Sequence, residues 1–394
     1  MRVLIPGIDG YLGWPLALHL TVAGHEVAGV DTFLRRQWVE EMGSDSATPI
    51  VPMSERTQAF KENFDKDLTF YEEDLCNYDA VERIFKEFQP EAIVHLGECP
   101  SAPYSMIDVH HATWVQVNNI SSTFNLLFAM RDVTPDAHLV KLGTMGEYGT
   151  PNIAIPEGFF EIEYRGRKDR LPFPRQAGSF YHQSKVHGSN NIVLACKLYG
   201  IKATDIMQGV VFGTHIDAMG EDEQLLTRLD FDEAFGTAIN RFTCQAVIDH
   251  PLTPYGKGHM KRGFLPLRDS MQCLTLALEN PPDGGEYRVF NQFEEVYDVY
   301  ELAEKVARVA RRLGLNTEVH HLENPRVELE EHFYEPDHSN LLDIGYQPTH
   351  DVEAEIEIMF NDLIRYRDRI EARKDVLIPS VHWDGRREKV HYLK

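Results

Sequence analysis

The stretch Arg2-Val-Leu-Ile-Pro-Gly-Ile-Asp-Gly-Tyr-Leu-Gly13 decides the fold of this chain. Its apolar start predicts a buried strand, and its glycines follow the spacing Gly7-x-x-Gly10-x-x-Gly13. Such glycines allow a tight turn and let a pyrophosphate approach the N-terminus of the next helix. Asp31 ends the second expected strand, where a carboxylate can bind the hydroxyls of an adenosine ribose. These residues predict a dinucleotide-binding fold with NAD as the cofactor.

Short apolar runs alternate with helix-like patterns through the first half of the chain. Alternation of this kind is typical of strands joined by crossover helices, and it predicts an α/β fold with a doubly wound parallel sheet of the Rossmann type. The expected strands are residues 2–6, 26–31, 68–73, 92–96, 138–142 and 202–207, and the expected helices are residues 11–23, 78–88, 112–131 and 181–199. The polar stretch 36–66 interrupts this pattern as an insertion.

The alternation weakens after Gln208, although a helical pattern returns at residues 299–313. We therefore expect two domains. Residues 1–207 would form the NAD-binding Rossmann domain, including helix 181–199. Residues 208–394 would form a smaller α/β lobe for a nucleotide-sugar substrate, with part of the chain crossing back to the sheet.

The composition disfavours several classes of function. The formal net charge of −23 argues against sequence-independent nucleic-acid binding, which needs a basic surface. No apolar run approaches the roughly 20 residues of a membrane span, and the first residues enter a strand without a signal-peptide pattern. The five cysteines are scattered, and the histidines lack a ligand pattern, so no metal site is expected. We expect a cytoplasmic protein with no nucleic-acid or membrane partner.

Arg35 and Arg36 follow Asp31 and leave a choice open. They could hold a 2′-phosphate, or they could be solvated or stacked on adenine, and the carboxylate of Asp31 favours NAD over NADP. The residues expected to contact the cofactor are Gly7, Asp9, Gly10, Tyr11, Gly13, Asp31, Arg35, Arg36, Asp74, Leu75, Leu96, Asn119, Tyr181, Lys185 and Gln208.

A second motif predicts the chemistry. Tyr181 and Lys185 are four residues apart and therefore lie on one helix face. A nearby ammonium, together with a positive nicotinamide ring, favours the phenolate, so the tyrosine can take a proton from a hydroxyl whose carbon gives up hydride. The hydroxyl of Thr144 would bind the same substrate oxygen, although it could also serve only to satisfy backbone groups at a strand end.

Several longer segments carry a family resemblance. Residues 139–152 (LVKLGTMGEYGTPN), 101–108 (SAPYSMID), 179–187 (SFYHQSKVH) and 291–293 (NQF) resemble the UDP-sulfoquinovose synthases, which are extended short-chain dehydrogenases/reductases. The resemblance implies a reaction on UDP-glucose in which C4 is oxidised, water leaves across C5 and C6, sulfite adds at C6, and C4 is reduced. NAD would be regenerated in each cycle and therefore tightly held.

The residues after Thr144 depart from those of related dehydratases. An Asp-Glu pair there would supply the acid and base of the elimination, but this chain has Met145 and Gly146. His182 and Glu147 are then the candidates for proton transfer at C5 and C6. We expect His182 to be the better one because an imidazole titrates near neutrality; it could also simply pack and hydrogen-bond.

Nucleotide-sugar enzymes of this type grip the pyrophosphate with arginines. The residues expected to bind the substrate on this resemblance are Ser101, Tyr104, Thr144, Met145, Gly146, Gln208, Thr237, Asn240, Arg241, Tyr255, Arg262, Arg268, Asp269 and Arg326. Before Ser101 the resemblance implies Gln-Arg, but this chain has Cys99-Pro100. Either another cation serves the sulfite, or the acceptor at C6 is not sulfite.

Two other readings and one assembly remain open. The chain could be a UDP-hexose 4,6-dehydratase or epimerase that does not use sulfite, or a non-catalytic NAD-binding regulator. The regulator is disfavoured because Thr144, Tyr181 and Lys185 are all present. Enzymes of this shape often pair through two helices, so we expect a homodimer through helices 112–131 and 181–199.

Overall fold

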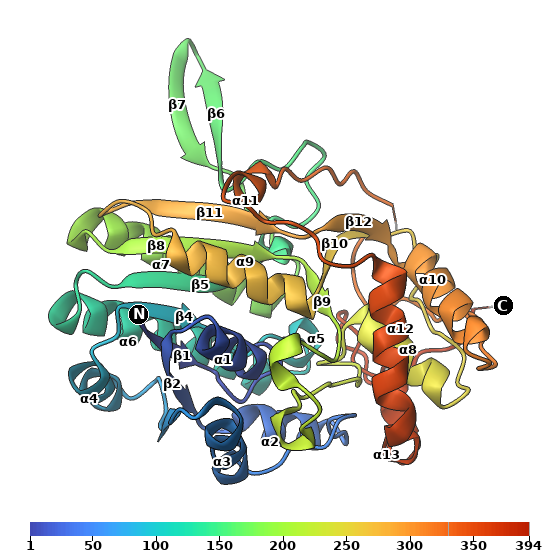
Figure 1. The fold of residues 1–394 in the computed structure, drawn as a ribbon. Helices are drawn as coiled ribbons and strands as arrows, with labels where there is room; N and C mark the ends of the chain where they lie inside the picture. Colours follow the sequence, from blue (N-terminus) through green and yellow to red (C-terminus); the bar gives the residue numbers. More distant parts are fainter. Residues whose placement is uncertain (330, 394) are drawn as a thin grey trace.

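The computed structural model describes residues 1–329 and 331–393, and a seven-stranded parallel sheet forms its centre (Figure 1). The strand order is β11-β8-β5-β4-β1-β2-β3, which confirms the predicted doubly wound sheet. The strands are β1 (Arg2–Pro6), β2 (Glu26–Asp31), β3 (Thr69–Glu72), β4 (Ala92–His95), β5 (His138–Thr144), β8 (Lys202–Gln208) and β11 (Tyr287–Gln292). Each predicted strand forms within two residues of its expected ends.

Both faces of the sheet are covered by helices because alternate residues of each strand point to opposite sides. Val3 and Ile5 of β1 pack with α1 (Gly13–Val22) and α9 (Leu267–Glu279). Leu4, between them, packs on the other side with α4, α6 and α7. These last helices are α4 (Tyr78–Phe88), α6 (Val109–Val133) and α7 (Phe180–Tyr199).

A smaller lobe extends the sheet at the carboxyl ends of its strands (Figure 1). Its three-stranded sheet has the order β12-β10-β9 and packs with α8, α10 and α12 in a separate apolar core. The elements are β9 (Val210–Phe212), β10 (Lys261–Pro266), β12 (Glu295–Asp298), α8 (Ala238–Val247), α10 (Val299–Arg312) and α12 (Val352–Leu363). The chain returns from this lobe to the main sheet as β11, which pairs with β8. The domain boundary at 207/208 stays a prediction.

The insertion expected at residues 36–66 folds as helices beside the second strand. It contains most of α2 (Leu34–Glu41) and all of α3 (Met53–Phe64), and Arg56 of α3 is fully buried. The remaining short helices are α5 (Ala102–Ser105), α11 (Ser339–Asp343) and α13 (Arg367–Glu371), with 3-10 turns at Met145–Glu147, Asp217–Met219, Glu223–Leu225, Ile364–Tyr366 and Lys374–Leu377. Among the helices of the described residues, none is long and apolar enough to cross a membrane.

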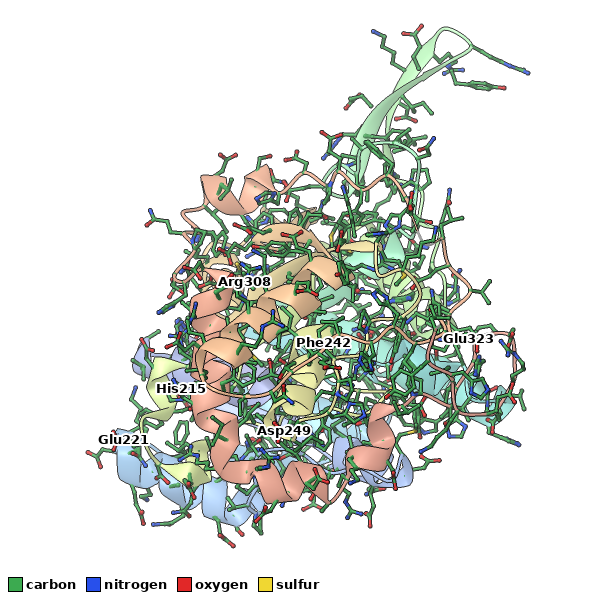
Figure 2. The ribbon with its side chains drawn as sticks, turned by 90° about the vertical axis from the view of Figure 1, so that its right-hand side faces the viewer. His215, Glu221, Phe242, Asp249, Arg308 and Glu323 are labelled. Carbon is green, nitrogen blue, oxygen red and sulfur yellow. The ribbon has the colours of Figure 1, made fainter. Side chains whose placement is uncertain are left out.

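A β-hairpin that the sequence analysis did not predict projects from the body (Figures 1 and 2). It consists of β6 (Phe159–Tyr164) and β7 (Arg167–Pro172), which pair only with each other. Arg165 and Gly166 form the turn, and both have positive φ angles, 52° and 74°. A two-residue turn of this kind matches the twist of the flanking strands. The sequence analysis missed the hairpin because charged residues interrupt the regular alternation of apolar side chains that predicts a strand.

Candidate active site

A cavity of about 540 Å³ opens where the carboxyl ends of the parallel strands meet the smaller lobe. Loops at this edge commonly hold the ligands of doubly wound sheets. The predicted residues that line the cavity are Gly7, Gly10, Tyr11, Gly13, Asp31, Arg35, Asp74, Leu75, Leu96, Thr144, Met145, Gly146, Tyr181, His182, Lys185, Gln208, Thr237, Arg241, Tyr255, Arg262 and Arg326. Other predicted residues lie outside it: Asp9, Arg36, Ser101, Tyr104, Asn119, Glu147, Asn240, Arg268 and Asp269.

The glycine turn after β1 leaves no space for side chains. A Cβ at Gly13 would lie 2.2 Å from the carbonyl oxygen of Gly7, and one at Gly7 would lie 2.5 Å from the backbone of Leu96. No side chain caps the N-terminus of α1. Its backbone N–H groups and this close turn fit the pyrophosphate of a dinucleotide.

The side chain of Asp9 turns away from the cavity, contrary to its expected role at the cofactor. It is fully buried and accepts hydrogen bonds from Arg36, at 2.7 Å from both Nε and Nη2, and from Nη1 of Arg56 at 2.8 Å. Arg36 is therefore held outside the cavity. Arg35 lines it but pairs with Asp230 at 2.7 Å and lies 4.0 Å from the ring of Phe235. Neither arginine is left free for a 2′-phosphate.

Asn119 also has a different place from the one expected. Its amide bonds both the N–H and the carbonyl of Cys99, at 2.8 and 3.1 Å, and the hydroxyl of Ser184 at 2.9 Å. It therefore ties the loop after β4 to α7, behind the cavity wall. Asn118, its neighbour, lines the cavity.

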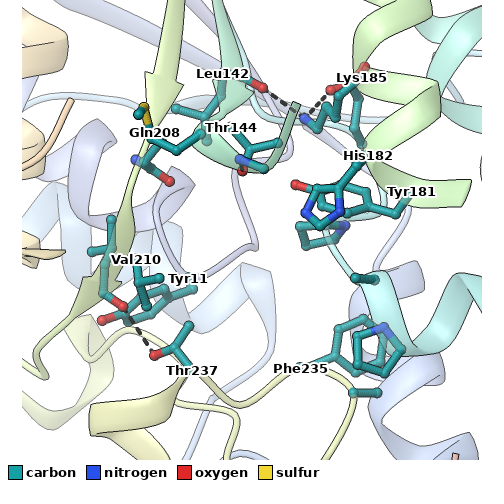
Figure 3. A pocket seen from close by; sticks show the side chains of 18 of the residues that line it. Tyr11, Leu142, Thr144, Tyr181, His182, Lys185, Gln208, Val210, Phe235 and Thr237 are labelled. Atoms are coloured by element: carbon teal, nitrogen blue, oxygen red, sulfur yellow. Dashed lines mark hydrogen bonds and ion pairs between the residues drawn. The ribbon is translucent and has the colours of Figure 1, made fainter. Parts of the chain in front are cut away.

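Thr144, Tyr181 and Lys185 converge at one end of the cavity (Figure 3). Thr144 ends β5, and its Oγ1 accepts a hydrogen bond from the N–H of Gly146 at 3.1 Å. Tyr181 and Lys185 are four residues apart and therefore lie one turn apart on α7, which begins just before them where Ser179 caps it. Burial, together with the carboxylate of Glu98, raises the pKa of Tyr181. The arrangement can bind a substrate hydroxyl between the threonine and the tyrosine.

Glu98 is a functional candidate that the sequence analysis missed. It lines the cavity and forms a buried ion pair with Lys185, whose Nζ also donates to the carbonyl of Leu142 at 2.8 Å. Thr123 donates to Glu98 at 3.2 Å. Burial raises the pKa of Glu98, but the charges of Lys185, His95 and Lys141 together outweigh burial, so the pKa is lowered. The sequence did offer one signal for Glu98, which is its position three residues after the end of β4.

His182 faces the cavity beside Tyr181 (Figure 3), with its Nδ1 2.9 Å from the hydroxyl of Ser179. Its Nε2 fills the space over Gly146, where a Cβ would lie only 2.3 Å away. Burial, with the charges of Arg326 and Arg262, lowers its pKa to about 3. The expectation that this imidazole titrates near neutrality is therefore wrong, and His182 is neutral at physiological pH.

Glu147, the second proton-transfer candidate, lies behind the cavity. Its carboxylate accepts from the N–H of Thr144 and completes a capping box. It also pairs with Arg175 at 2.7 Å and with the buried ammonium of Lys141 at 3.2 Å. Lys141 in turn donates to the carbonyl of Lys185 at 3.1 Å. Glu147 therefore positions β5 and α7 and has no open path to a substrate.

Cationic and aromatic side chains also line the cavity. The guanidinium of Arg326 lies between the rings of Tyr255 and Trp383, 5.7 and 5.6 Å from their centroids. Arg241 hydrogen-bonds the hydroxyl of Tyr255, and Arg262 pairs with Glu328 at 2.7 Å. Three arginines beside two aromatic rings can hold a pyrophosphate and stack a base. Trp383 was not predicted because it is far in sequence from the predicted residues, and Glu328 was missed although it follows Arg326 by two residues.

Five residues assigned to the substrate have structural partners instead. Arg268 pairs with Glu355 at 2.9 Å and Asp217 at 3.0 Å. The others are also engaged: Asp269 with Thr349 and Tyr346, Asn240 with the N–H of Gly213, Ser101 with the carbonyl of Ala234, and Tyr104 with Glu41. Arg268 and Asp269 lie on α9. The polar side of this helix faces α12 and the segment just before α12, and it does not face the cavity. Among the described residues, no group of three or more His, Cys, Asp or Glu could hold a metal ion.

Known proteins resemble the chain in both sequence and fold. Residues 3–291 match the model of the NAD dependent epimerase/dehydratase family. A UDP-sulfoquinovose synthase of Sulfolobus acidocaldarius is 47% identical over all of this chain and 99% of its own length. The chloroplastic UDP-sulfoquinovose synthase of Spinacia oleracea is 46% identical over 97% of this chain and 79% of its own length.

Solved structures share the fold at low sequence identity. A UDP-glucose 4-epimerase of Thermotoga maritima with UDP-glucose has a TM-score of 0.69 at 18% identity, covering 94% of this chain and 99% of its own. A UDP-glucuronic acid 4-epimerase of Bacillus cereus with UDP-glucuronic acid and NAD has a TM-score of 0.68 at 19% identity, covering 93% and 99%. At these identities the likeness concerns the fold alone.

Proposed function

Because this chain belongs to the NAD-dependent epimerase/dehydratase family, and within it to the UDP-sulfoquinovose synthases, we propose that it converts UDP-glucose and sulfite into UDP-sulfoquinovose. The observation that carries the proposal is 47% identity over the full chain. The cavity supports it, because its lining brings Thr144, Tyr181 and Lys185 together with three arginines, Arg241, Arg262 and Arg326.

The first proposed step occurs at C4 of the sugar. NAD, held by the glycine turn after β1, would supply the hydride acceptor for this step and the hydride donor for the final reduction at C4. Thr144 would hold the C4 hydroxyl while Tyr181, as the phenolate that Lys185 and the nicotinamide ring favour, takes its proton and becomes a phenol. The glycine turn and the uncapped α1 N-terminus fit the cofactor's pyrophosphate. Tight retention of NAD is part of the proposal, because a cycle that returns the hydride needs no exchange.

The later steps need a proton carrier at C5 and C6. The 4-keto sugar has an acidic C5 proton, so loss of water gives a 4-keto-5,6-ene to which sulfite adds at C6. His182 is the proposed carrier because its imidazole faces the cavity and adjoins the ring of Tyr181. Glu147 is not, because the buried ion pairs with Arg175 and Lys141 hold it elsewhere.

Mass spectrometry of products from UDP-glucose, with and without sulfite, tests the reaction. We expect a sulfonated UDP-hexose only when both substrates are present, and loss of that product in Tyr181→Phe with UDP-glucose binding retained. Loss of water or an isomer formed regardless of sulfite would contradict the proposal and favour a UDP-hexose 4,6-dehydratase or epimerase. NAD released in near-equimolar amount by denaturing the purified protein would support tight binding.

The proposal also includes that the protein forms a homodimer and works in a reducing compartment. Helices α6 and α7 expose Val117, Phe124, Leu194 and Leu198, and such apolar side chains favour pairing with a second copy. We expect Leu198→Glu to dissociate the dimer. All five cysteines are free thiols, which supports the cytoplasm, whereas the spinach relative is named as chloroplastic.

A further inference from the structure

The register of the β6–β7 hairpin sorts its side chains onto two unlike faces. On one face Phe160 opposes Leu171, Ile162 opposes Asp169 and Tyr164 opposes Arg167, so four apolar side chains share this face with two charged ones. We call Phe160, Ile162, Tyr164 and Leu171 the apolar face. The opposite face is polar, since Glu161 opposes Arg170 and Glu163 opposes Lys168.

The side chains of the two faces differ in how many contacts they make within the hairpin. On the polar face Lys168 reaches Glu163 at 3.7 Å, and the guanidinium of Arg170 lies 4.6 Å from the ring of Phe159. On the apolar face Phe160 meets Phe173 edge-on at 5.5 Å at the base, and the guanidinium of Arg165 lies 5.2 Å from the ring of Tyr164 at the tip. Tyr164 is still 66% exposed, and Leu171, opposite Phe160, is 41% exposed. The apolar face therefore ends in open, unfilled surface.

A hairpin of this kind needs a covering partner. An isolated two-stranded ribbon is marginally stable in water, and apolar side chains on one of its faces gain stability only when they are buried. The hairpin stands clear of the body in Figure 2, and β6 and β7 form a sheet of their own. The body leaves the outer half of the apolar face exposed.

The charge of the hairpin tip differs from that of the chain. Residues 164–168 contain three basic side chains, Arg165, Arg167 and Lys168, and no acidic one. The whole chain has a net charge of −23. The overall negative charge of a second copy of this chain therefore attracts the basic tip.

We propose that the β6–β7 hairpin is an arm that packs its apolar face and basic tip against a second copy of this chain. The inference rests on the proposed homodimer and adds a second contact to it. Residues 173–179 connect β7 directly to α7, so the arm begins near the helix pair of that interface. In a two-fold dimer each arm reaches the other copy, and the contact is made twice.

Sedimentation of the full chain over a dilution series tests the arm. The double variant Tyr164→Asp/Leu171→Asp changes two exposed side chains, so folding is retained. We expect its dimer dissociation constant to rise at least ten-fold. The matched control, Glu161→Gln/Arg170→Gln on the polar face, should stay within two-fold of wild type. A photo-crosslinker at position 164 should give a covalent dimer.

The possible outcomes distinguish failure of the proposed arm contact from failure of the proposed homodimer. Suppose that Leu198→Glu dissociates the dimer, but that the apolar-face variant forms a dimer as stable as that of its control. This result would overturn the arm contact and leave the helix interface supported. Crosslinks that stay within one chain would overturn the arm as well. A wild type that remains monomeric at all concentrations would overturn both proposals.

Discussion

Lys185 and Glu98 form an ion pair in the cavity wall, with both side chains almost fully buried. Until ligands bind, the ammonium expected to favour the phenolate of Tyr181 is thus opposed by a carboxylate of the protein itself. Burial and Glu98 together raise the pKa of Tyr181. Tyr181 therefore stays a phenol until substrate and the positive nicotinamide ring are bound, which suits a residue that must return its proton at the end of the cycle.

Glu98→Gln should shift the pH profile of the enzyme. Removing the carboxylate lowers the pKa of Tyr181, so the acid limb of kcat should move to lower pH by about one unit. Ultraviolet titration of the phenolate should show the same direction. Thr123→Val removes a hydrogen bond to the carboxylate but keeps its charge, and should shift the limb less. An unchanged limb in Glu98→Gln would show that the ion pair is only structural.

Gly146→Ala should displace His182, because the added methyl would lie 2.3 Å from Nε2. We expect sulfonated product to fall by at least about ten-fold if His182 carries the proton, since general acid–base catalysis contributes roughly 10²–10⁴-fold. Gly188→Ala, on α7, adds the same methyl at 3.6 Å from Thr123 and is the control. Equal activity of the two variants would exclude His182 from the elimination.

Pro100→Arg should improve sulfite binding. Pro100 lines the cavity and offers no charge to an anion. A partly exposed ion pair contributes up to about 1 kcal/mol, so the KM for sulfite should fall by up to about five-fold while the KM for UDP-glucose is unchanged. Pro100→Gln removes the ring without adding charge. If it lowers the KM equally, the cation is not the cause.

His138→Gln should change how stability depends on pH. Burial, followed by Arg288, lowers the pKa of His138 to about 4. Because this value is below the unfolded value, the neutral histidine contributes stability above about pH 6.5 and loses it as pH falls toward 4. The wild-type advantage over the variant should therefore shrink by up to about 1.4 kcal/mol per pH unit in that window. Urea denaturation at about pH 7 and about pH 5 measures it; an advantage that grows on acidification would reverse the sign.

The local motifs could be read from sequence because their geometry is local. Gly7, Gly10 and Gly13 act within one turn, and Tyr181 and Lys185 within one helical turn. Asp9 could not be placed in this way, since its partner Arg56 lies on the inserted helix α3. Similarly, the sequence suggested that Arg268 binds phosphate, but in the structure its position on α9 directs it toward Glu355 on α12. Contacts between distant segments decide such cases.

The return of the chain to the main sheet has a consequence for biosynthesis. β8 ends at Gln208, but its outer edge is covered only when β11 is complete at Gln292. At ribosomal speeds of roughly 5–20 residues per second, that edge stays open for on the order of ten seconds. An uncovered strand edge invites pairing with other chains. Newly made copies therefore pass through an aggregation-prone stage, and yield in a cell should depend on chaperones that shield nascent chains.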